Sequence, residues 1–282
     1  MREKCKIALC QMNVVDNKPE NLEHARQMVD TASQKGARIV VLPEIFNVPY
    51  DPDIMAANAE NYGGPTTSLL SALACRNKII LVGGSIPEKD DNGKIYNTSY
   101  VFDEKGTVMG RHRKMHLFDI DLPDQISFKE SSVFSAGASM PIIRHKDLVL
   151  AVIICYDVRF PELARLAALA GVHLLIVPAA FNTVTGPAHW DLTMRCRALD
   201  NQLFVAACSP ARNPKAGYHA WGHSLVADPW GKVLNEAGIG EEIIEAELDW
   251  GTVDKVRREL PLLKHRRTDI YELNPNQALE DI

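Results

Sequence analysis

Three residues that end or follow a run of similar side chains carry the chemical groups that acyl-transfer chemistry requires. Cys155 ends the apolar run 148–155 and is followed at once by polar, turn-forming residues, which indicates a buried strand that delivers a thiol to a sharp turn. Glu44 follows a second apolar run that ends in Pro43, and Lys114 ends a basic stretch that begins at Arg111. A thiol, a carboxylate and an ammonium group can act as nucleophile, base and oxyanion stabiliser.

Each of the three residues also has an ordinary structural interpretation. Free cysteine is among the most buried residue types, so Cys155 alone would be taken as a core residue. Glu44 alone would be a solvated turn residue, and Lys114 alone a solvated lysine at a strand end. The core interpretation does not explain the polar residues directly after Cys155. The specificity of the pattern therefore comes from the segments around the three residues.

Composition excludes several classes of protein. The chain has 282 residues, of which 46% are hydrophobic, enough for one large α/β domain or two small ones. A net charge of −5 argues against a general nucleic-acid binder, because affinity for phosphate depends on concentrated positive charge. No apolar stretch approaches the roughly 20 residues of a membrane span. We expect neither a nucleic-acid partner nor a membrane partner.

The cysteines and the N-terminus predict a reducing location. The six cysteines are scattered without a C-x-x-C pair, and several lie inside apolar runs, which favours reduced thiols. The first residues lack the apolar core of a signal peptide. We expect a cytoplasmic protein and leave a mitochondrial pool open.

Two histidine pairs have the i, i+4 spacing that chelates a metal on a helix. They are His112 with His116 and His219 with His223. Neither pair carries the glutamate of an H-E-x-x-H motif, and both lie in segments that are predicted to be loop or strand. Polar histidines without a metal are therefore favoured.

The elements that must position these residues alternate along the chain without a linker. Asn17 and Glu20 resemble a capping box, and Gly36 would end the helix that they begin. Hydrophobic periodicity and turn residues predict the other elements. Strands are expected over 6–11, 38–42, 79–83, 95–102, 107–113, 141–144, 148–154, 174–177, 203–209, 224–227 and 242–248, and helices over 17–35, 67–77, 161–171 and 188–200, with a final helix towards Leu260. The alternation favours one layered α/β domain with mixed sheets.

One weak internal echo links two of the expected strands. Residues 39–46 and 174–181 both run from an apolar strand into a Pro-x-x-Phe turn. The position of Glu44 is occupied by Ala179 in the second segment, so only one segment carries the base. Little else aligns, and the chain is treated as a single domain over 1–282.

Three longer segments resemble the signature regions of the nitrilase (carbon–nitrogen hydrolase) superfamily. In chain order they are Leu42-Pro43-Glu44, Arg113-Lys114-Met115-His116-Leu117-Phe118 and Cys155-Tyr156-Asp157-Val158-Arg159-Phe160-Pro161-Glu162-Leu163. The resemblance covers nearly the whole chain. It implies a four-layer α-β-β-α sandwich with two mixed sheets and a catalytic triad of Glu44, Lys114 and Cys155. It also implies a second glutamate beside the triad, Glu130.

Further segments resemble the ω-amidase branch of that superfamily. They are 114–121, 181–190 and Ser209-Pro210-Ala211-Arg212. This resemblance implies hydrolysis of the terminal amide of α-ketoglutaramate and α-ketosuccinamate through a cysteinyl thioester. It also implies a homodimer. The partners would be a small amide and water, with no metal or organic cofactor required.

Chemical reasoning gives each residue of the triad a role. A free thiol has a pKa near 8.5, so a neighbouring base and cation are needed for reaction at neutral pH. Glu44 would take the thiol proton, pass it to the leaving ammonia and later activate water. Lys114 and the backbone N–H of Tyr156 would stabilise the oxyanion, and Glu130 would orient Lys114.

Substrate recognition is predicted at three residues. Arg159 is a candidate clamp for a substrate carboxylate, because its planar fork binds a carboxylate with two hydrogen bonds. Its alternative role is a salt bridge within the turn, to Asp157 or Glu162. Thr185 is a candidate hydroxyl donor, and Tyr50 is a candidate pocket residue through its closeness to Glu44 in the sequence.

Two alternative functions remain open at this point. An amidase or carbamoylase of the same superfamily would keep the triad and change the carboxylate clamp. A non-catalytic scaffold is the alternative from another class, and the intact triad speaks against it.

Overall fold

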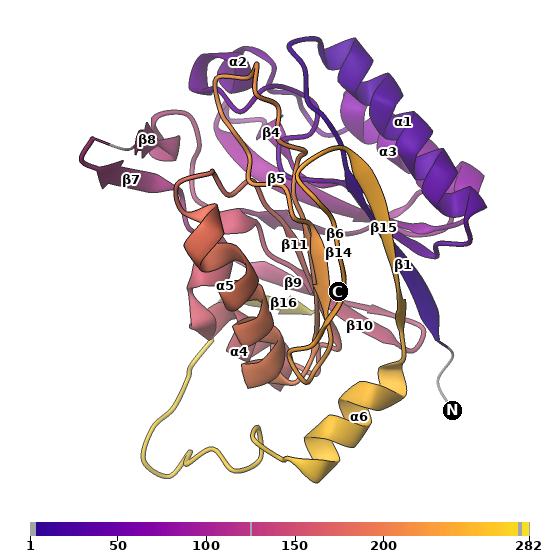
Figure 1. The fold of residues 1–282 in the computed structure, drawn as a ribbon, viewed down its shortest axis with the longest axis vertical. Coiled ribbons are helices and arrows are strands. Elements are labelled where there is room, and N and C mark those ends of the chain that lie inside the picture. The colour runs from indigo at the N-terminus through magenta and orange to yellow at the C-terminus, as the bar shows by residue number, and fades with distance from the viewer. Residues whose placement is uncertain (1–3, 125, 276–277, 282) are drawn as a thin grey trace.

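Two mixed β-sheets packed face to face form the centre of the molecule (Figure 1). The computed structural model describes residues 4–124, 126–275 and 278–281. The first sheet has the order β15 (Glu242–Leu248), β1 (Cys5–Gln11), β2 (Ile39–Val41), β3 (Ile80–Val82), β5 (Ile95–Phe102) and β4 (Ile86–Lys89), with β6 (Val108–Arg113) also paired to β5. The second sheet has the order β14 (Val233–Glu236), β13 (Leu225–Ala227), β12 (Phe204–Cys208), β11 (Leu174–Pro178), β10 (Leu148–Val152), β9 (Met140–His145) and β16 (Leu279–Asp281).

Helices cover the outer face of each sheet. Helices α1 (Lys18–Gln34) and α3 (Pro65–Asn77) pack on the first sheet, and α4 (Pro161–Leu169) and α5 (Gly186–Asn201) pack on the second. The four layers α-β-β-α that the sequence resemblance implied are therefore confirmed. The remaining helices are α2 (Pro52–Ala57), α6 (Trp250–Glu259) and the short 3-10 turns η1 (Glu130–Ser132) and η2 (Cys155–Arg159). Among the helices of the described residues, none combines the length and apolar character that crossing a bilayer requires.

The apolar runs of the central strands follow from this layering. In β1, Ile7 and Leu9 face the second sheet, whereas Ala8 and Cys10 face the helices. In β11, Leu174 and Ile176 point between the sheets, whereas Leu175 and Val177 point to α4 and α5. A strand buried on both faces has no polar face, so it appears in the sequence as an unbroken apolar run.

Most predicted elements are confirmed with shifted ends. Asn17 caps α1 by accepting a hydrogen bond from the N–H of Glu20 at 3.2 Å, and Gly36 follows the helix with φ 90°. Among the helices and strands, the sequence prediction missed α2, β4, β14, β16 and the two strands of a hairpin, β7 (Asp119–Leu122) and β8 (Ile126–Lys129). These elements are short, and β7 and β8 carry alternating exposed polar residues outside the two main sheets.

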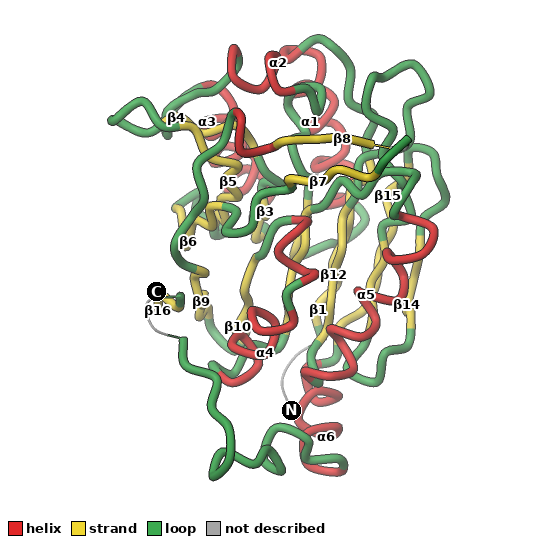
Figure 2. Tube along the Cα trace, turned by 90° about the vertical axis from the view of Figure 1, so that its left-hand side faces the viewer, coloured by secondary structure: helices red, strands yellow, loops and turns green. Residues whose placement is uncertain are grey.

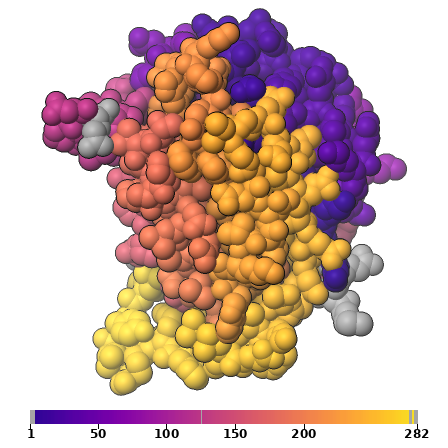
Figure 3. Space-filling view, viewed as in Figure 1, coloured from indigo at the N-terminus to yellow at the C-terminus, as the bar shows by residue number. Residues whose placement is uncertain are grey.

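The C-terminal part of the chain closes the edge of the second sheet. After α6 the chain runs as a long loop past α4, and β16 then pairs in parallel with β9 (Figure 2). Figure 3 shows this segment in yellow along the lower end of the molecule. Along the chain, Glu44, Lys114 and Cys155 follow β2, β6 and β10, and Glu130 follows β8.

Candidate active site

A turn with fixed backbone geometry presents Glu44 directly after β2. Ile45 has φ 47°, a left-handed conformation that is costly for a β-branched residue. Its N–H donates to the hydroxyl of Ser85 at 3.0 Å, and the Ser85 N–H donates to the carbonyl of Pro43 at 3.2 Å. Gly84 has φ 54°, and a Cβ at this position would lie 2.1 Å from the Pro43 carbonyl oxygen. The neighbouring loop after β3 therefore holds the turn and directs Glu44 inward.

Cys155 occupies the sharp turn that the sequence predicted. Sheet pairing of β10 ends at Val152, and Cys155 opens the turn η2 with φ 45°. Its side chain is buried, with 5% of the residue surface exposed. Non-glycine residues in this conformation store strain of about 1–3 kcal/mol and cluster at functional sites. The backbone conformation therefore supports a functional role for this thiol over a packing role.

Lys114 follows β6 and is fixed by its backbone. Its N–H donates to the carbonyl of Asn97 at 2.9 Å, and its carbonyl accepts from the N–H of Gly137 at 2.8 Å. A Cβ at Gly137 would lie 2.1 Å from the carbonyl oxygen of Arg113, so only glycine fits against this segment. The side chain of Lys114 is completely buried, and its charge must be compensated by its neighbours.

Two buried carboxylates compensate that charge. The Nζ of Lys114 lies 2.9 Å from Oε1 of Glu44 and 2.8 Å from Oε2 of Glu130, and all three side chains are fully buried. The amide of Asn97 donates to Oε1 of Glu44 at 2.9 Å and to Oε1 of Glu130 at 3.1 Å. The hydroxyl of Tyr50 lies 3.3 Å from the same two oxygens. Three donors thus hold the two carboxylates side by side.

The second oxygen of each carboxylate has its own backbone donor. Oε2 of Glu130 accepts from the N–H of Phe118 at 2.6 Å. Oε2 of Glu44 accepts from the N–H of Ala180 at 2.8 Å, and Ala180 lies in the turn that follows β11. Ala180 in the segment 174–181 corresponds to Ile45 in the similar segment 39–46. The turns that end these two segments therefore meet between the sheets: the first supplies Glu44, and the second supplies a backbone N–H that donates to it.

Electrostatics favour a neutral thiol beside a base in the resting site. Burial raises the pKa of Cys155 well above its usual range, and the negative charge of Glu44 raises it further. Burial also raises the pKa of Glu44, which Lys114 partly offsets. Burial alone would lower the pKa of Lys114, but Glu130 and Glu44 together raise it well above its usual range. Lys114 stays charged, and a Glu44 of raised pKa is suited to take the proton of Cys155.

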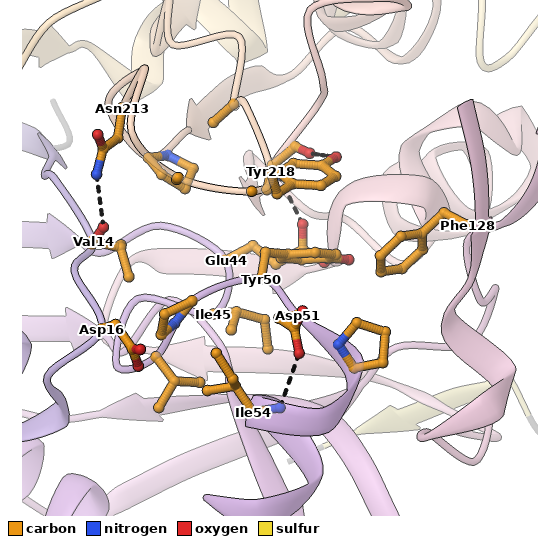
Figure 4. A pocket seen from close by; sticks show the side chains of 18 of the residues that line it. Val14, Asp16, Glu44, Ile45, Tyr50, Asp51, Ile54, Phe128, Asn213 and Tyr218 are labelled. Carbon is orange, nitrogen blue, oxygen red and sulfur yellow. Dashed lines mark hydrogen bonds between the residues drawn. The ribbon is translucent and has the colours of Figure 1, made fainter. Parts of the chain in front are cut away.

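A cavity of about 910 Å³ reaches the side chain of Glu44. Its wall includes Glu44, Tyr50, Ala180 and Tyr218, with Phe128 on the side of the β7–β8 hairpin (Figure 4). The ring centroids of Tyr50 and Tyr218 are 4.7 Å apart, and the hydroxyl of Tyr218 donates to the carbonyl of Ala180. The cavity gives a small molecule a route to the carboxylate base.

Arg159 lies half-buried beside the nucleophile without a carboxylate partner. Its guanidinium carbon is 4.4 Å from the centre of the Phe181 ring, and Nη1 is 2.9 Å from Nδ1 of His189. Within the described residues it forms no ion pair, so the alternative salt bridge to Asp157 or Glu162 is wrong. The carboxylate of Asp157 instead binds the rings of His112 at 2.9 Å and His116 at 2.8 Å.

The other residues with predicted roles are Tyr50, Tyr156 and Thr185, and only the first contacts the carboxylates of Glu44 and Glu130. Tyr50 belongs to the carboxylate cluster itself, and its predicted role as a pocket residue is compatible with its place in the cavity wall. Tyr156 is the second residue of η2, where its N–H follows the nucleophile. The hydroxyl of Thr185 donates to Oδ1 of Asn182 at 3.2 Å, just before α5. The substrate roles of Tyr156 and Thr185 stay predictions.

The sequence reasoning missed Asn97, Ala180 and Tyr218. Asn97 had a detectable signal, because the run Asn97-Thr98-Ser99 places consecutive polar residues inside a strand that is otherwise apolar and aromatic, and all three are buried. A buried polar run needs partners, which marks it as a candidate site. Ala180 acts through its backbone and carried no such signal.

The fold and the site agree with comparisons to known proteins. The sequence profile described as carbon-nitrogen hydrolase matches residues 6–258, and the chain belongs to this family. The protein is accordingly an amidohydrolase that acts on carbon–nitrogen bonds. The relatives include the protein named omega-amidase NIT3 of Saccharomyces cerevisiae, which is 50% identical over 279 residues, covering 96% of both chains. The omega-amidase NIT2 of Danio rerio is 47% identical over 274 residues, covering 97% of this chain and 99% of its own.

Solved structures support the same assignment. The crystal structure of Saccharomyces cerevisiae Nit3, described as a member of branch 10 of the nitrilase superfamily, superimposes with a TM-score of 0.86 at 46% identity. The match covers 95% of this chain and 98% of that one. An amidase from Nesterenkonia sp. superimposes with a TM-score of 0.79 at 26% identity, covering 96% of each chain.

Proposed function

We propose that this amidohydrolase cleaves the terminal amide of small dicarboxylate ω-amides, with α-ketoglutaramate and α-ketosuccinamate as the expected substrates. The observation that carries the proposal is the guanidinium of Arg159, which is half-buried on the same turn η2 as Cys155, lies over the ring of Phe181, and has no ion pair in the described residues. An uncompensated cation beside a nucleophile favours a substrate that carries its own carboxylate. The names of the similar proteins from yeast and zebrafish agree with that class of substrate.

The proposed reaction proceeds through a thioester. Glu44 removes the proton of Cys155, and the sulfur attacks the amide carbon. Lys114 and the N–H of Tyr156 stabilise the oxyanion, and such donors typically contribute about 3–4 kcal/mol each. The carbon–nitrogen bond breaks as Glu44 gives its proton to the leaving ammonia. Glu44 then takes a proton from water, whose oxygen attacks the thioester, and the sulfur leaves and recovers the proton.

His189 defines the orientation of the proposed clamp. An arginine offers only donors, so the contact at 2.9 Å requires Nδ1 of His189 to accept and the ring to carry its proton on Nε2. The ring of Phe181 supports one face of the guanidinium. Two of the five N–H groups of Arg159 are sufficient for a two-pronged contact with a substrate carboxylate.

Replacement of Arg159 is expected to separate acidic from neutral substrates. R159K keeps the charge but loses the planar fork, so KM for α-ketoglutaramate should rise by about 10- to 100-fold, or about 1.4–2.7 kcal/mol. R159M should lower kcat/KM for α-ketoglutaramate far more than for a neutral amide of similar length. R195M is a matched control, because Arg195 lies on α5 and bonds Asp191 and the carbonyl of Gly231. Equal losses for both substrates in R159M would rule out the clamp.

Ammonia release from a panel of substrates tests the function as a whole. The panel contains the two ω-amides, a neutral amide, a nitrile and an N-carbamoyl amino acid. We expect turnover of the ω-amides with much lower rates for the others. Turnover of the carbamoyl compound in preference to the ω-amides would replace the proposal with a carbamoylase, and turnover of nothing would favour the scaffold.

We further propose that the protein is a cytoplasmic homodimer. Leu192 and Leu199 on α5 are 62% and 41% exposed, and Leu169 on the neighbouring α4 is 39% exposed, so these helices present apolar surface that a second copy can cover. The free thiol of the exposed Cys75 suits a reducing compartment. A light-scattering mass of one chain, at micromolar concentration, would contradict the dimer.

A further inference from the structure

The carboxylate of Asp157 joins the segments that carry Lys114 and Cys155. Its Oδ1 accepts from the backbone N–H of His116 at 2.8 Å and lies 2.8 Å from Nδ1 of the same residue. Its Oδ2 lies 2.9 Å from Nε2 of His112 and accepts from the N–H of Ile154 at 3.1 Å. Asp157 is fully buried, so all four contacts are shielded from water.

The positions of these partners along the chain are specific. His112 and His116 lie two residues before and two residues after Lys114, whereas Ile154 directly precedes Cys155. Lys114 follows a strand of the first sheet and Cys155 follows a strand of the second. A single carboxylate therefore fixes both sides of the lysine segment to the nucleophile turn across the two sheets.

A ring contact reinforces the same connection. The imidazole of His116 stacks on Phe160, with ring centroids 3.7 Å apart and an interplanar angle of 14°. Phe160 directly follows η2, so the stack joins the end of the nucleophile turn to the lysine segment. The lysine segment is thus connected to Asp157 within η2 and to Phe160 directly after it.

The hydrogen-bond pattern defines the protonation of the two rings. A carboxylate has no donor, so Nε2 of His112 and Nδ1 of His116 must both carry hydrogen. Nδ1 of His112 is buried and has no hydrogen-bond partner within the described residues. Burial alone would raise the pKa of Asp157, but the hydrogen bonds from His112 and His116 lower it well below its usual range. The carboxylate therefore remains ionised at neutral pH.

We propose that Asp157 is a positioning residue for amide hydrolysis, which sets the distance between the ammonium of Lys114 and the nucleophile turn through His112 and His116. An oxyanion contributes its full stabilisation only when its donors lie about 2.7–3.1 Å from it. A displacement of about 1 Å can lower the rate about 100-fold. The inference rests on the proposed roles of Cys155 and Lys114.

The first test is D157N, assayed with the full-length protein well below its melting temperature. The asparagine keeps the shape of the side chain but places a donor where Oδ2 accepted from Ile154 and His112. We expect kcat for α-ketoglutaramate to fall by about 100-fold while KM stays within about threefold. Loss of folded protein would also lower the apparent kcat at constant KM, but only in proportion to the folded fraction, so a loss of about 100-fold in a sample that circular dichroism shows to be folded identifies a positioning effect.

A pair of variants at His112 gives a second, independent test. In H112Q the amide nitrogen takes the place of Nε2 and can still donate to Asp157, whereas H112L fills similar space without a donor. We expect H112L to lose at least about tenfold in kcat and H112Q to recover most of that loss. This pair decides the question if D157N does not fold.

D30N serves as the matched control for the loss of a bonded carboxylate. Asp30 lies in the outer helix layer, where it connects α1 to α3 through Asn77 at 2.8 Å and through Arg76. Its kcat should equal that of the wild type. A folded D157N with kcat within threefold of the wild type, or an H112Q as slow as H112L, would overturn the positioning role alone. An active C155A would instead overturn the proposed nucleophile, and the positioning role with it.

Discussion

Replacement of Cys155 by alanine is expected to lower kcat by about a million-fold and to leave the fold intact. Residues of a catalytic triad act as a unit, so removal of the nucleophile removes nearly all of its contribution. The substitution deletes one buried sulfur, and it leaves the backbone turn at φ 45° in place. Ammonia release from α-ketoglutaramate measures the rate, and circular dichroism with thermal melting measures the fold.

The control for this variant is C208A. Cys208 is also fully buried, and its sulfur contacts the carbonyl oxygens of Cys10 at 3.6 Å and Val41 at 3.4 Å in the core between the sheets. C208A should lose some stability and keep its activity per folded molecule. Amidase activity retained in a well-folded C155A would exclude Cys155 as the nucleophile.

Substitution of the two glutamates is expected to have unequal effects. E44Q should lower kcat by about 10⁴-fold, because the amide cannot accept the thiol proton and general base catalysis contributes up to about that factor. E130Q should lower kcat by about 100-fold. Oε2 of Glu130 accepts from both the ammonium of Lys114 and the N–H of Phe118, and glutamine offers one oxygen acceptor in place of two, so Lys114 is held less well. Single-turnover assays, in which mass spectrometry detects the acyl-enzyme, measure how fast each of the two variants forms the thioester.

The pH dependence of the wild type gives a further check on Glu44. A base must be ionised to act, and burial raises the pKa of Glu44 above its usual value. The fall of kcat/KM towards acid pH should therefore begin above the pKa of about 4.3 of an ordinary glutamate. Full activity in E44Q would exclude Glu44 as the base. Equal and near-complete losses in folded E44Q and E130Q would make Glu130 a catalytic residue as well.

The sequence by itself determined the features that depend on neighbours along the chain. The apolar runs predicted the central strands, because strands buried on both faces need no polar positions. Asn17 and Gly36 marked the ends of α1, since capping and left-handed backbone are local properties. The abrupt change at Cys155 predicted the nucleophile turn for the same reason. The assignment of Glu130 came from family resemblance, because no local pattern marked it.

Only the tertiary structure decided which groups meet in the site. Glu44 receives its donors from Asn97, which is 53 residues away, and from Ala180, which is 136 residues away and acts through its backbone. The sequence offered Asp157 as a partner for Arg159, but the packing of the two sheets gave that carboxylate to His112 and His116. Arg159 was thereby left without an ion pair in the described residues. Hydrogen bonds between sheets depend on strand order and layer packing, and residue types along the chain do not encode these pairings locally.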